Sequence, residues 1–193
     1  MAIHIHNYDL PRNLDLGKSI AIDTETMGLN PHRDRLCLVQ LSSGDGDAHL
    51  VKIAHPSADA PHLKALLADP KRGKLFHFAR ADLLFIKKYL GVEIENVDCT
   101  KIMSKIARSY SDKHGLKDLI KEFIGIDVSK QLQSSDFGGE LTEKQLKYCA
   151  QDVVYLHKIY TSLKKILERE KRMVLYENTI KFINTRVELD FAS

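Results

Sequence analysis

A short apolar run that ends in two carboxylates is the feature that most constrains the fold of this chain. The run Ser19–Ile22 leads directly into Asp23-Thr24-Glu25. Short apolar runs are typical of buried strands, and side chains two residues apart on a strand point to the same face. Asp23 and Glu25 therefore lie side by side at the end of a predicted strand. Two carboxylates this close favour protonation unless a cation is supplied. The spacing fits an alternative equally well, in which one carboxylate caps the following helix and the other is solvated.

Length and composition indicate an ordinary globular protein. The chain has 193 residues, 44% of them hydrophobic and 28% charged, which suffices for the core of one domain, residues 1–193. A net charge of +3 argues against the strong basic stripe of a long nucleic-acid track. Three cysteines without a C-x-x-C pair favour neither disulfides nor zinc. No signal peptide and no apolar run of the roughly 20 residues that span a membrane is recognisable, so we expect a cytoplasmic protein.

The first third of the chain predicts strands joined by short turns. Ile3 and Ile5 alternate with His4 and His6, which indicates a short edge strand with surface histidines within residues 1–18. Three further strands are expected at 19–25, 35–41 and 48–53, with turns at 28–31 and 42–47. Such short connections imply an antiparallel meander.

From residue 61 the hydrophobic period becomes helical. Helices are expected at 61–67, 79–90, 100–109 and 115–124, and strands at 74–77 and 97–99. Thr142 and Gln145 form a capping box that opens one long helix to about residue 172. A helical tail from about 172 includes a further helix from Tyr176 and then an extended end. Together these elements predict an α/β domain built on a mixed sheet.

Further chemistry-bearing residues follow the carboxylate pair. Asp82 falls at the start of the helix after the 74–77 strand. Tyr148 and Asp152 are four residues apart on a predicted helix and so share one face. Each residue taken alone is most simply a surface carboxylate or a tyrosine at the rim of the core. A carboxylate pair on a strand, an Asp at a helix start and a Tyr-x-x-x-Asp, in this order, are not easily dismissed together.

This combination resembles the DEDD superfamily of 3′→5′ exonucleases, in the subclass with a catalytic tyrosine that includes ribonuclease D. The three motifs are Asp23-Thr24-Glu25, the segment with Asp82, and Tyr148 with Asp152, and the similarity runs from about 19 to 160. The resemblance implies an RNase H-like fold, in which helices flank a mixed five-stranded sheet. It also implies a metal-dependent exonuclease.

Four shorter segments look like nano-RNase C, the small bacterial branch that cuts diribonucleotides at the end of RNA decay. These segments are residues 31–37, 41–46, 114–117 and 129–136. The resemblance implies a short RNA as substrate and a ring-shaped octamer, for which the helical tail is a candidate contact. We expect no C-terminal helical nucleic-acid-binding domains of the ribonuclease D kind.

The resemblance also assigns roles to the motif residues. It implies two divalent cations, Mg²⁺ or Mn²⁺, which suit hard oxygen ligands. Asp23, Glu25 and Asp152 would hold the cation that carries the attacking water. Asp23 would bridge to the second cation, with Asp82 helping through water. Tyr148 would orient the water, although an ordinary pKa near 10 makes a free tyrosine a poor base.

Residues that bind the substrate are less sharply indicated. By the same resemblance, Leu29 occupies the position at which oligoribonucleases of this superfamily place an apolar wedge between two bases; the alternative is a buried leucine of the turn. His77 and Phe78 pack against the 3′ nucleotide, or belong to the core. A polar set from two loops binds a 5′ phosphate or a ribose hydroxyl, or is merely solvated: His114, Lys130, Gln133, Ser134 and Ser135.

Two other functions remain open at this point. A ribonuclease D-like or Werner-type exonuclease would trim longer RNA or DNA, and it predicts an open basic groove. A non-catalytic nucleic-acid-binding module would have lost at least one acidic motif residue, whereas all four are present together with the tyrosine.

Overall fold

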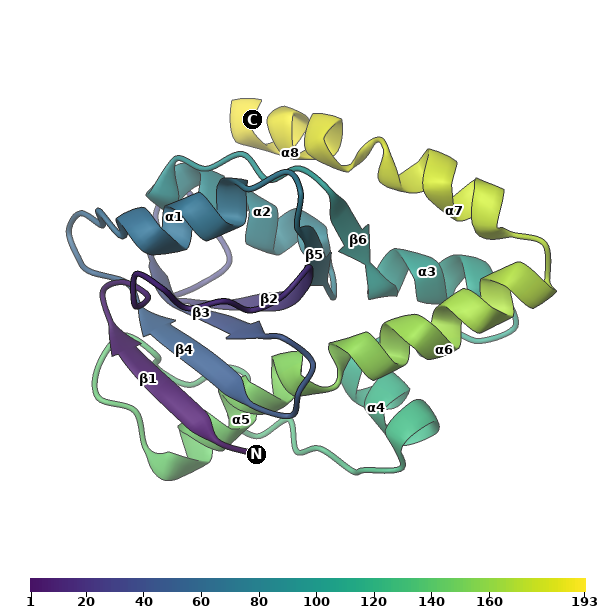
Figure 1. Cartoon of the computed structure of the whole chain (residues 1–193), viewed down its shortest axis with the longest axis horizontal. Coiled ribbons are helices and arrows are strands. Elements are labelled where there is room, and N and C mark those ends of the chain that lie inside the picture. The colour runs from purple at the N-terminus through teal and green to yellow at the C-terminus, as the bar shows by residue number, and fades with distance from the viewer.

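The computed structural model describes residues 1–193 and contains one six-stranded mixed sheet (Figure 1). The strand order across the sheet is β1-β4-β3-β2-β5-β6. β2, β3 and β4 form an antiparallel meander, whereas β1, β5 and β6 each pair with a parallel neighbour. The strands are β1 Ile3–Asn7, β2 Ser19–Thr26, β3 Leu36–Ser42, β4 Ala48–Lys52, β5 Gly73–Phe76 and β6 Val97–Cys99.

The α/β class, the mixed sheet and the meander predicted from the sequence are confirmed, but the count of five strands is wrong. The additional strand is β1, which pairs along β4 from Ile3 opposite Ala48 to Asn7 opposite Lys52. The alternating pattern near the N-terminus had predicted this edge strand. His4 is exposed there, and His6 hydrogen-bonds across to His49 of β4 over 2.9 Å.

Helices cover both faces of the sheet (Figure 1). α1 and α2 bury apolar side chains on one face, together with Ile20 and Ile22 of β2. α5 covers the other face, where Cys149 and Val153 pack with Ala21. None of the helices is both long and apolar enough to cross a membrane. The helices are α1 Pro61–Ala68, α2 Ala79–Leu90, α3 Thr100–Ala107, α4 Leu116–Ile124, α5 Glu143–Val154, α6 Leu156–Arg169, α7 Met173–Ile180 and α8 Ile183–Ala192.

The single long helix predicted after residue 141 is wrong, because the chain forms α5 and α6 with a break at Tyr155. The predicted capping box is present: Gln145 N donates to Thr142 Oγ1 over 3.2 Å, and Thr142 N donates to Gln145 Oε1 over 2.9 Å. α5 packs on the sheet, whereas α6 packs on α3 and α4 through a separate apolar cluster. The two halves thus bury against different partners, and Figure 1 shows the break between them.

The C-terminal tail is helical to Ala192, so the predicted extended end is wrong. Its two helices pack on the same domain. The buried hydroxyl of Tyr176 in α7 hydrogen-bonds to Asp98 and to the backbone N–H of Cys99. Arg80 of α2 donates two hydrogen bonds to Asp190 of α8. These contacts fix the tail against β6 and α2.

Candidate active site

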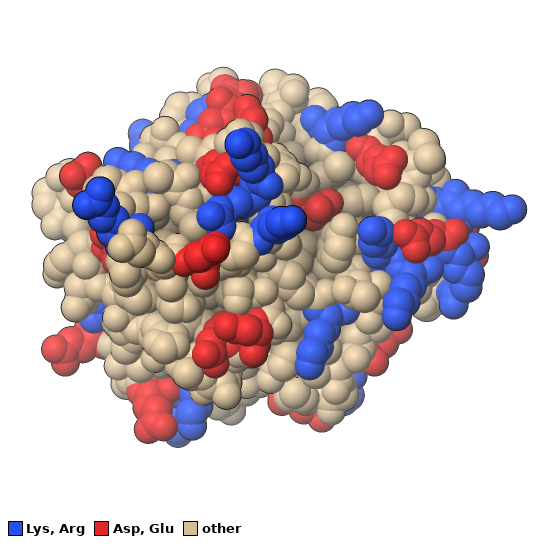
Figure 2. Space-filling model, in the orientation of Figure 1, with Lys and Arg blue, Asp and Glu red and all other residues tan.

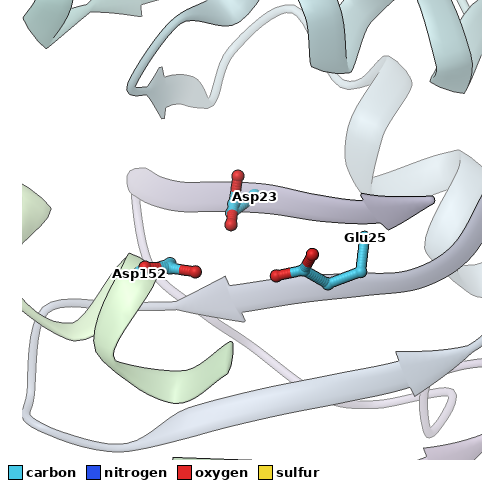
Figure 3. A group of neighbouring side chains, drawn as sticks. All are labelled: Asp23, Glu25 and Asp152. Carbon is cyan, nitrogen blue, oxygen red and sulfur yellow. The ribbon is translucent and has the colours of Figure 1, made fainter. Parts of the chain in front are cut away.

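Three carboxylates from two distant parts of the chain converge at one point. Asp23 and Glu25 extend from β2, and Asp152 extends from α5. One oxygen of each lies within 4.8 Å of an oxygen of the other two. Figure 3 shows the three side chains pointing into a common space between the strand and the helix. The sequence predicted that Asp23 and Glu25 would share a face, and the fold adds Asp152 to that face.

The helical period of α5 brings Asp152 to this point. Cys149, Ala150 and Val153 are fully buried against the sheet and fix the rotation of the helix. With that rotation, Tyr148 and Asp152, one turn apart, both lie toward the carboxylate end of β2. The predicted pairing of these two side chains on one helix face therefore coincides with the acidic cluster.

A buried glutamine that the sequence analysis missed holds the carboxylate pair. Gln40 of β3 lies directly opposite Asp23 in the sheet. Its side-chain Nε2 donates to Asp23 Oδ2 over 3.2 Å and to Glu25 Oε1 over 3.1 Å. Because a buried amide is costly unless it is hydrogen-bonded, a lone Gln inside an apolar strand was a signal that pointed to this role.

Asp82 lies beside the cluster rather than within it. It sits in the first turn of α2, as predicted, and accepts a hydrogen bond of 2.5 Å from the hydroxyl of Thr24. Thr24 is the residue between Asp23 and Glu25, so its hydroxyl connects the second motif to the first. Sequence reasoning gave Thr24 no role, and nothing in a single sequence indicates its partner.

Burial, and for three of the four the negative charge of Asp23, makes the carboxylates hold protons unusually tightly. Burial raises the pKa of Asp23 to about 7. Burial and the neighbouring charge of Asp23 raise the pKa of Glu25 to about 9. The same two causes hold the pKa values of Asp82 and Asp152 well above the ordinary range. Since a bound cation removes both penalties, the clustered oxygen donors fit a hard divalent cation such as Mg²⁺ or Mn²⁺.

Tyr148 is buried next to this cluster, and two other side chains pack against its ring. The Phe137 ring stacks on it with centroids 6.1 Å apart, and Lys117 Nζ lies 4.8 Å from its ring centroid. Burial, and then the charges of Asp152 and Glu25, raise the pKa of Tyr148 further above its ordinary value. The phenol is therefore protonated at neutral pH and has a hydrogen to donate.

The structure separates the remaining predicted residues into exposed and internally bonded ones. Leu29 is 94% exposed, so the alternative of a buried turn leucine is wrong. Phe78 is 46% exposed at the start of α2, with Lys101 Nζ 4.1 Å from its ring centroid. His77 Nδ1 lies 2.8 Å from Thr100 Oγ1, and burial lowers the pKa of His77 to about 3, which keeps this imidazole neutral.

The polar loop at 129–139 has neither helix nor strand, and hydrogen bonds hold it at several points. Lys130, Gln133 and Ser134 are exposed. Ser135 Oγ accepts a hydrogen bond of 3.2 Å from Gln145 in α5. His114, in the turn before α4, lies with its Nδ1 2.8 Å from Ser104 Oγ. None of these side chains hydrogen-bonds to the four carboxylates.

We expect a divalent cation to stabilise the fold more at alkaline pH than at acidic pH. A carboxylate whose folded pKa is raised binds more protons folded than unfolded, so metal-free stability falls as pH rises from about 4 through about 7 for Asp23 and about 9 for Glu25. A cation offsets that loss, by about 2.7 kcal/mol when present at about 100 times its Kd. Thermal unfolding with Mg²⁺ or with chelator, at about pH 6 and about pH 8.5, measures the increment. An equal increment at both pH values contradicts this expectation.

Comparison with known families agrees with this geometry. Residues 8–168 match the family model described as 3′-5′ exonuclease. Ribonuclease D of Gluconacetobacter diazotrophicus is 33% identical over 155 residues, which are 80% of this chain and 39% of that protein. The chain thus spans about two fifths of the length of this ribonuclease D.

Solved structures give the same result over the whole chain. Brucella melitensis NrnC is 46% identical with a TM-score of 0.95, and the match covers 100% of this chain and 95% of that one. NrnC has also been solved with bound Mg²⁺ and bound to pGG. Escherichia coli RNase D is 26% identical with a TM-score of 0.77, covering 88% of this chain and 45% of that one. With its acidic cluster and these matches, the chain belongs to the 3′-5′ exonuclease family, among relatives of ribonuclease D.

Proposed function

We propose that this protein is a metal-dependent 3′→5′ exoribonuclease. It hydrolyses very short RNA, chiefly diribonucleotides, to nucleoside 5′-monophosphates at the end of RNA decay. The observation that carries the proposal is the convergence of Asp23, Glu25 and Asp152 one helical turn from Tyr148. The choice of a short substrate is supported by the full-length similarity to NrnC, which has been solved bound to pGG.

The acidic residues provide the oxygen donors of the reaction centre. Asp23, Glu25 and Asp152 would hold one cation, and Asp23 would also serve a second cation with the help of Asp82. When bound, two divalent cations stabilise negative charge on the attacking and leaving oxygens. Gln40 keeps the carboxylates of Asp23 and Glu25 in a fixed orientation, since its amide donates to both.

Tyr148 orients the attacking water. Its ring is held by Phe137 and Lys117, so its hydroxyl has a defined place near Asp152. Because the pKa of Tyr148 lies above its ordinary value, the hydroxyl acts as a hydrogen-bonding group and not as a free base. A cation held by the acidic residues would then supply most of the activation of the attacking water.

Side chains outside the acidic cluster bind the substrate. Leu29 is the wedge between the two bases, a role that only an exposed apolar side chain can perform. Phe78 and His77 contact the 3′ nucleotide. Base stacking on an aromatic ring contributes roughly 1–3 kcal/mol per base, which suits the exposed ring of Phe78. The polar side chains of the two loops bind the 5′ phosphate or a ribose hydroxyl: His114, Lys130, Gln133, Ser134 and Ser135.

We also propose a cytoplasmic homo-oligomer, an octamer by family resemblance. Large apolar side chains on the tail remain exposed in the single chain: Val174, Leu175, Phe182 and Leu189. Exposed apolar clusters mark interaction surfaces. The mass of the particle in solution, measured by light scattering, bears directly on this assembly.

A ribonuclease D-like enzyme that trims longer RNA or DNA is the second candidate, and the family membership favours it equally. It needs a groove that follows the nucleic-acid backbone with positive charge. Figure 2 shows acidic and basic side chains interspersed on the face drawn, without a continuous basic stripe there. The face drawn therefore provides no continuous basic groove of the kind that a long substrate needs.

A length series separates the two candidates. The series consists of 5′-phosphorylated RNAs from two to about seven nucleotides, incubated with Mg²⁺ or Mn²⁺. We expect the dinucleotide to be cleaved with a kcat/KM at least about tenfold higher than that of the longer RNAs, which corresponds to a difference of about 1.4 kcal/mol in free energy. A DNA dinucleotide of the same sequence is the matched substrate control. Comparable rates across lengths indicate the trimming exonuclease. Absence of metal-dependent cleavage at every length refutes both enzymatic proposals.

A further inference from the structure

A lysine outside the acidic motifs sits on the ring of Tyr148. Lys117 is in the first turn of α4, and its Nζ lies 4.8 Å from the centroid of that ring. This distance is within the range of a cation–π contact, which is worth roughly 0.5–1 kcal/mol when exposed and more when desolvated. Lys117 is only partly exposed, so water weakens this contact less than at the surface.

A backbone hydrogen bond fixes the position of the Lys117 ammonium group. Its Nζ donates to the carbonyl oxygen of Ser129 over 2.7 Å, at the start of the polar loop. A lysine side chain normally has many rotamers, and an ammonium group held at both the ring and the carbonyl retains few of them. Lys117 therefore connects three parts of the site, namely α4, the polar loop and the tyrosine of α5.

The charges around Lys117 explain why an ammonium group is retained there. Asp152 and Glu25 attract it, whereas Lys130 of the polar loop repels it. Burial is the largest effect and, together with Lys130, lowers the pKa of Lys117 below its ordinary value. The carboxylates of the acidic cluster therefore offset only part of the cost of burying the ammonium group, which the ring and the carbonyl orient.

The opposite end of α4 provides a comparison within the same helix. Lys121, one turn further, pairs with Asp127 over 2.9 Å, and its side chain is 69% exposed. It also contacts the segment that leads into the polar loop but does not touch Tyr148. Lys117, by contrast, combines a contact to the polar loop with a contact to the tyrosine.

We propose that Lys117 is a positioning residue that acts through Tyr148, because its ammonium group, anchored on the Ser129 carbonyl, holds the phenol ring in the orientation in which the hydroxyl meets the attacking water. This inference rests on the proposed function, in which Tyr148 orients that water. Misplacement of a catalytic group by about 1 Å is enough to cost on the order of a hundredfold in rate.

The test compares Lys117→Met, Lys117→Arg and the control Lys121→Met in cleavage of a 5′-phosphorylated diribonucleotide with Mn²⁺. We expect Lys117→Met to lower kcat about tenfold to a hundredfold while KM changes by less than about threefold. Lys117→Arg retains a cation over the ring and restores most of kcat. Lys121→Met behaves as the unsubstituted protein.

A double substitution identifies the residue through which Lys117 acts. In a Tyr148→Phe background the hydroxyl is already absent, so Lys117→Met should lower kcat by less than about threefold further. Two full, multiplying effects would show that Lys117 acts elsewhere and would overturn the proposal. An unchanged kcat in Lys117→Met overturns it as well.

Two measurements without turnover separate positioning from general damage. Lys117→Met should bind Mn²⁺ at least as tightly as the unsubstituted protein, because a neighbouring positive charge opposes a divalent cation. Weaker Mn²⁺ binding indicates a disrupted site and overturns the proposal. The Tyr148 ring signals in NMR spectra of tyrosine-labelled protein should move in Lys117→Met and return toward their original positions in Lys117→Arg. These signals test the contact even if the unsubstituted protein cleaves no RNA, a result that refutes only the proposed function.

Discussion

Substitution of Asp23 by Asn is expected to abolish metal-dependent cleavage, lowering kcat/KM for a diribonucleotide by about a thousandfold or more. Asp23 faces both Glu25 and Asp152, and the proposal places it at both cations. Asn has nearly the same shape but no negative charge, so the fold is kept and cation binding is lost. Cleavage with Mg²⁺ and with Mn²⁺, together with Mn²⁺ titration, measures both effects.

The stability of Asp23→Asn distinguishes loss of function from loss of fold. In the metal-free protein, burial raises the pKa of Asp23 to about 7, so a neutral side chain at this position avoids the cost of a buried charge at neutral pH. We expect a midpoint of thermal unfolding equal to or above that of the unsubstituted protein without metal. Asp127→Asn, at a residue whose side chain is 82% exposed, is the matched control and should keep full activity. Substantial activity in Asp23→Asn contradicts the assignment of the site.

Substitution of Tyr148 by Phe should lower kcat by about a hundredfold, the lower end of the range for a positioned proton-transfer group. The phenyl ring keeps its contacts with Phe137 and Lys117, so only the hydroxyl is removed. Since the proposed role is orientation of water and not cation binding, Mn²⁺ affinity should stay within about threefold of the unsubstituted value. Single-turnover kinetics with the diribonucleotide measures the chemical step.

The control for Tyr148→Phe is the same substitution at Tyr110, which is 77% exposed. Tyr110→Phe should cleave at the unsubstituted rate. If Tyr148→Phe also retains the full rate, the hydroxyl has no part in the reaction. If it loses Mn²⁺ binding instead, Tyr148 supports the acidic cluster and does not orient the water.

The sequence by itself determined the main elements of the fold. Apolar runs and turn residues predicted β2, β3 and β4, and helical periodicity predicted α1 to α4 within a few residues, because short-range patterning dictates these elements. The alternation of a strand placed Asp23 beside Glu25, and the period of a helix placed Tyr148 beside Asp152. Each pair lies within five residues of chain, where local geometry suffices.

Tertiary structure alone decided how these local pairs assemble. Packing of α5 on the sheet and of α6 on α3 and α4 breaks the predicted long helix at Tyr155. Pairing of β3 with β2 brings Gln40 to the carboxylates, and α2 brings Asp82 to Thr24. Exposure of Leu29 and the contact of Lys117 with Tyr148 likewise depend on residues far apart in the chain. Such contacts depend on long-range burial and pairing, which no local period of a single sequence encodes.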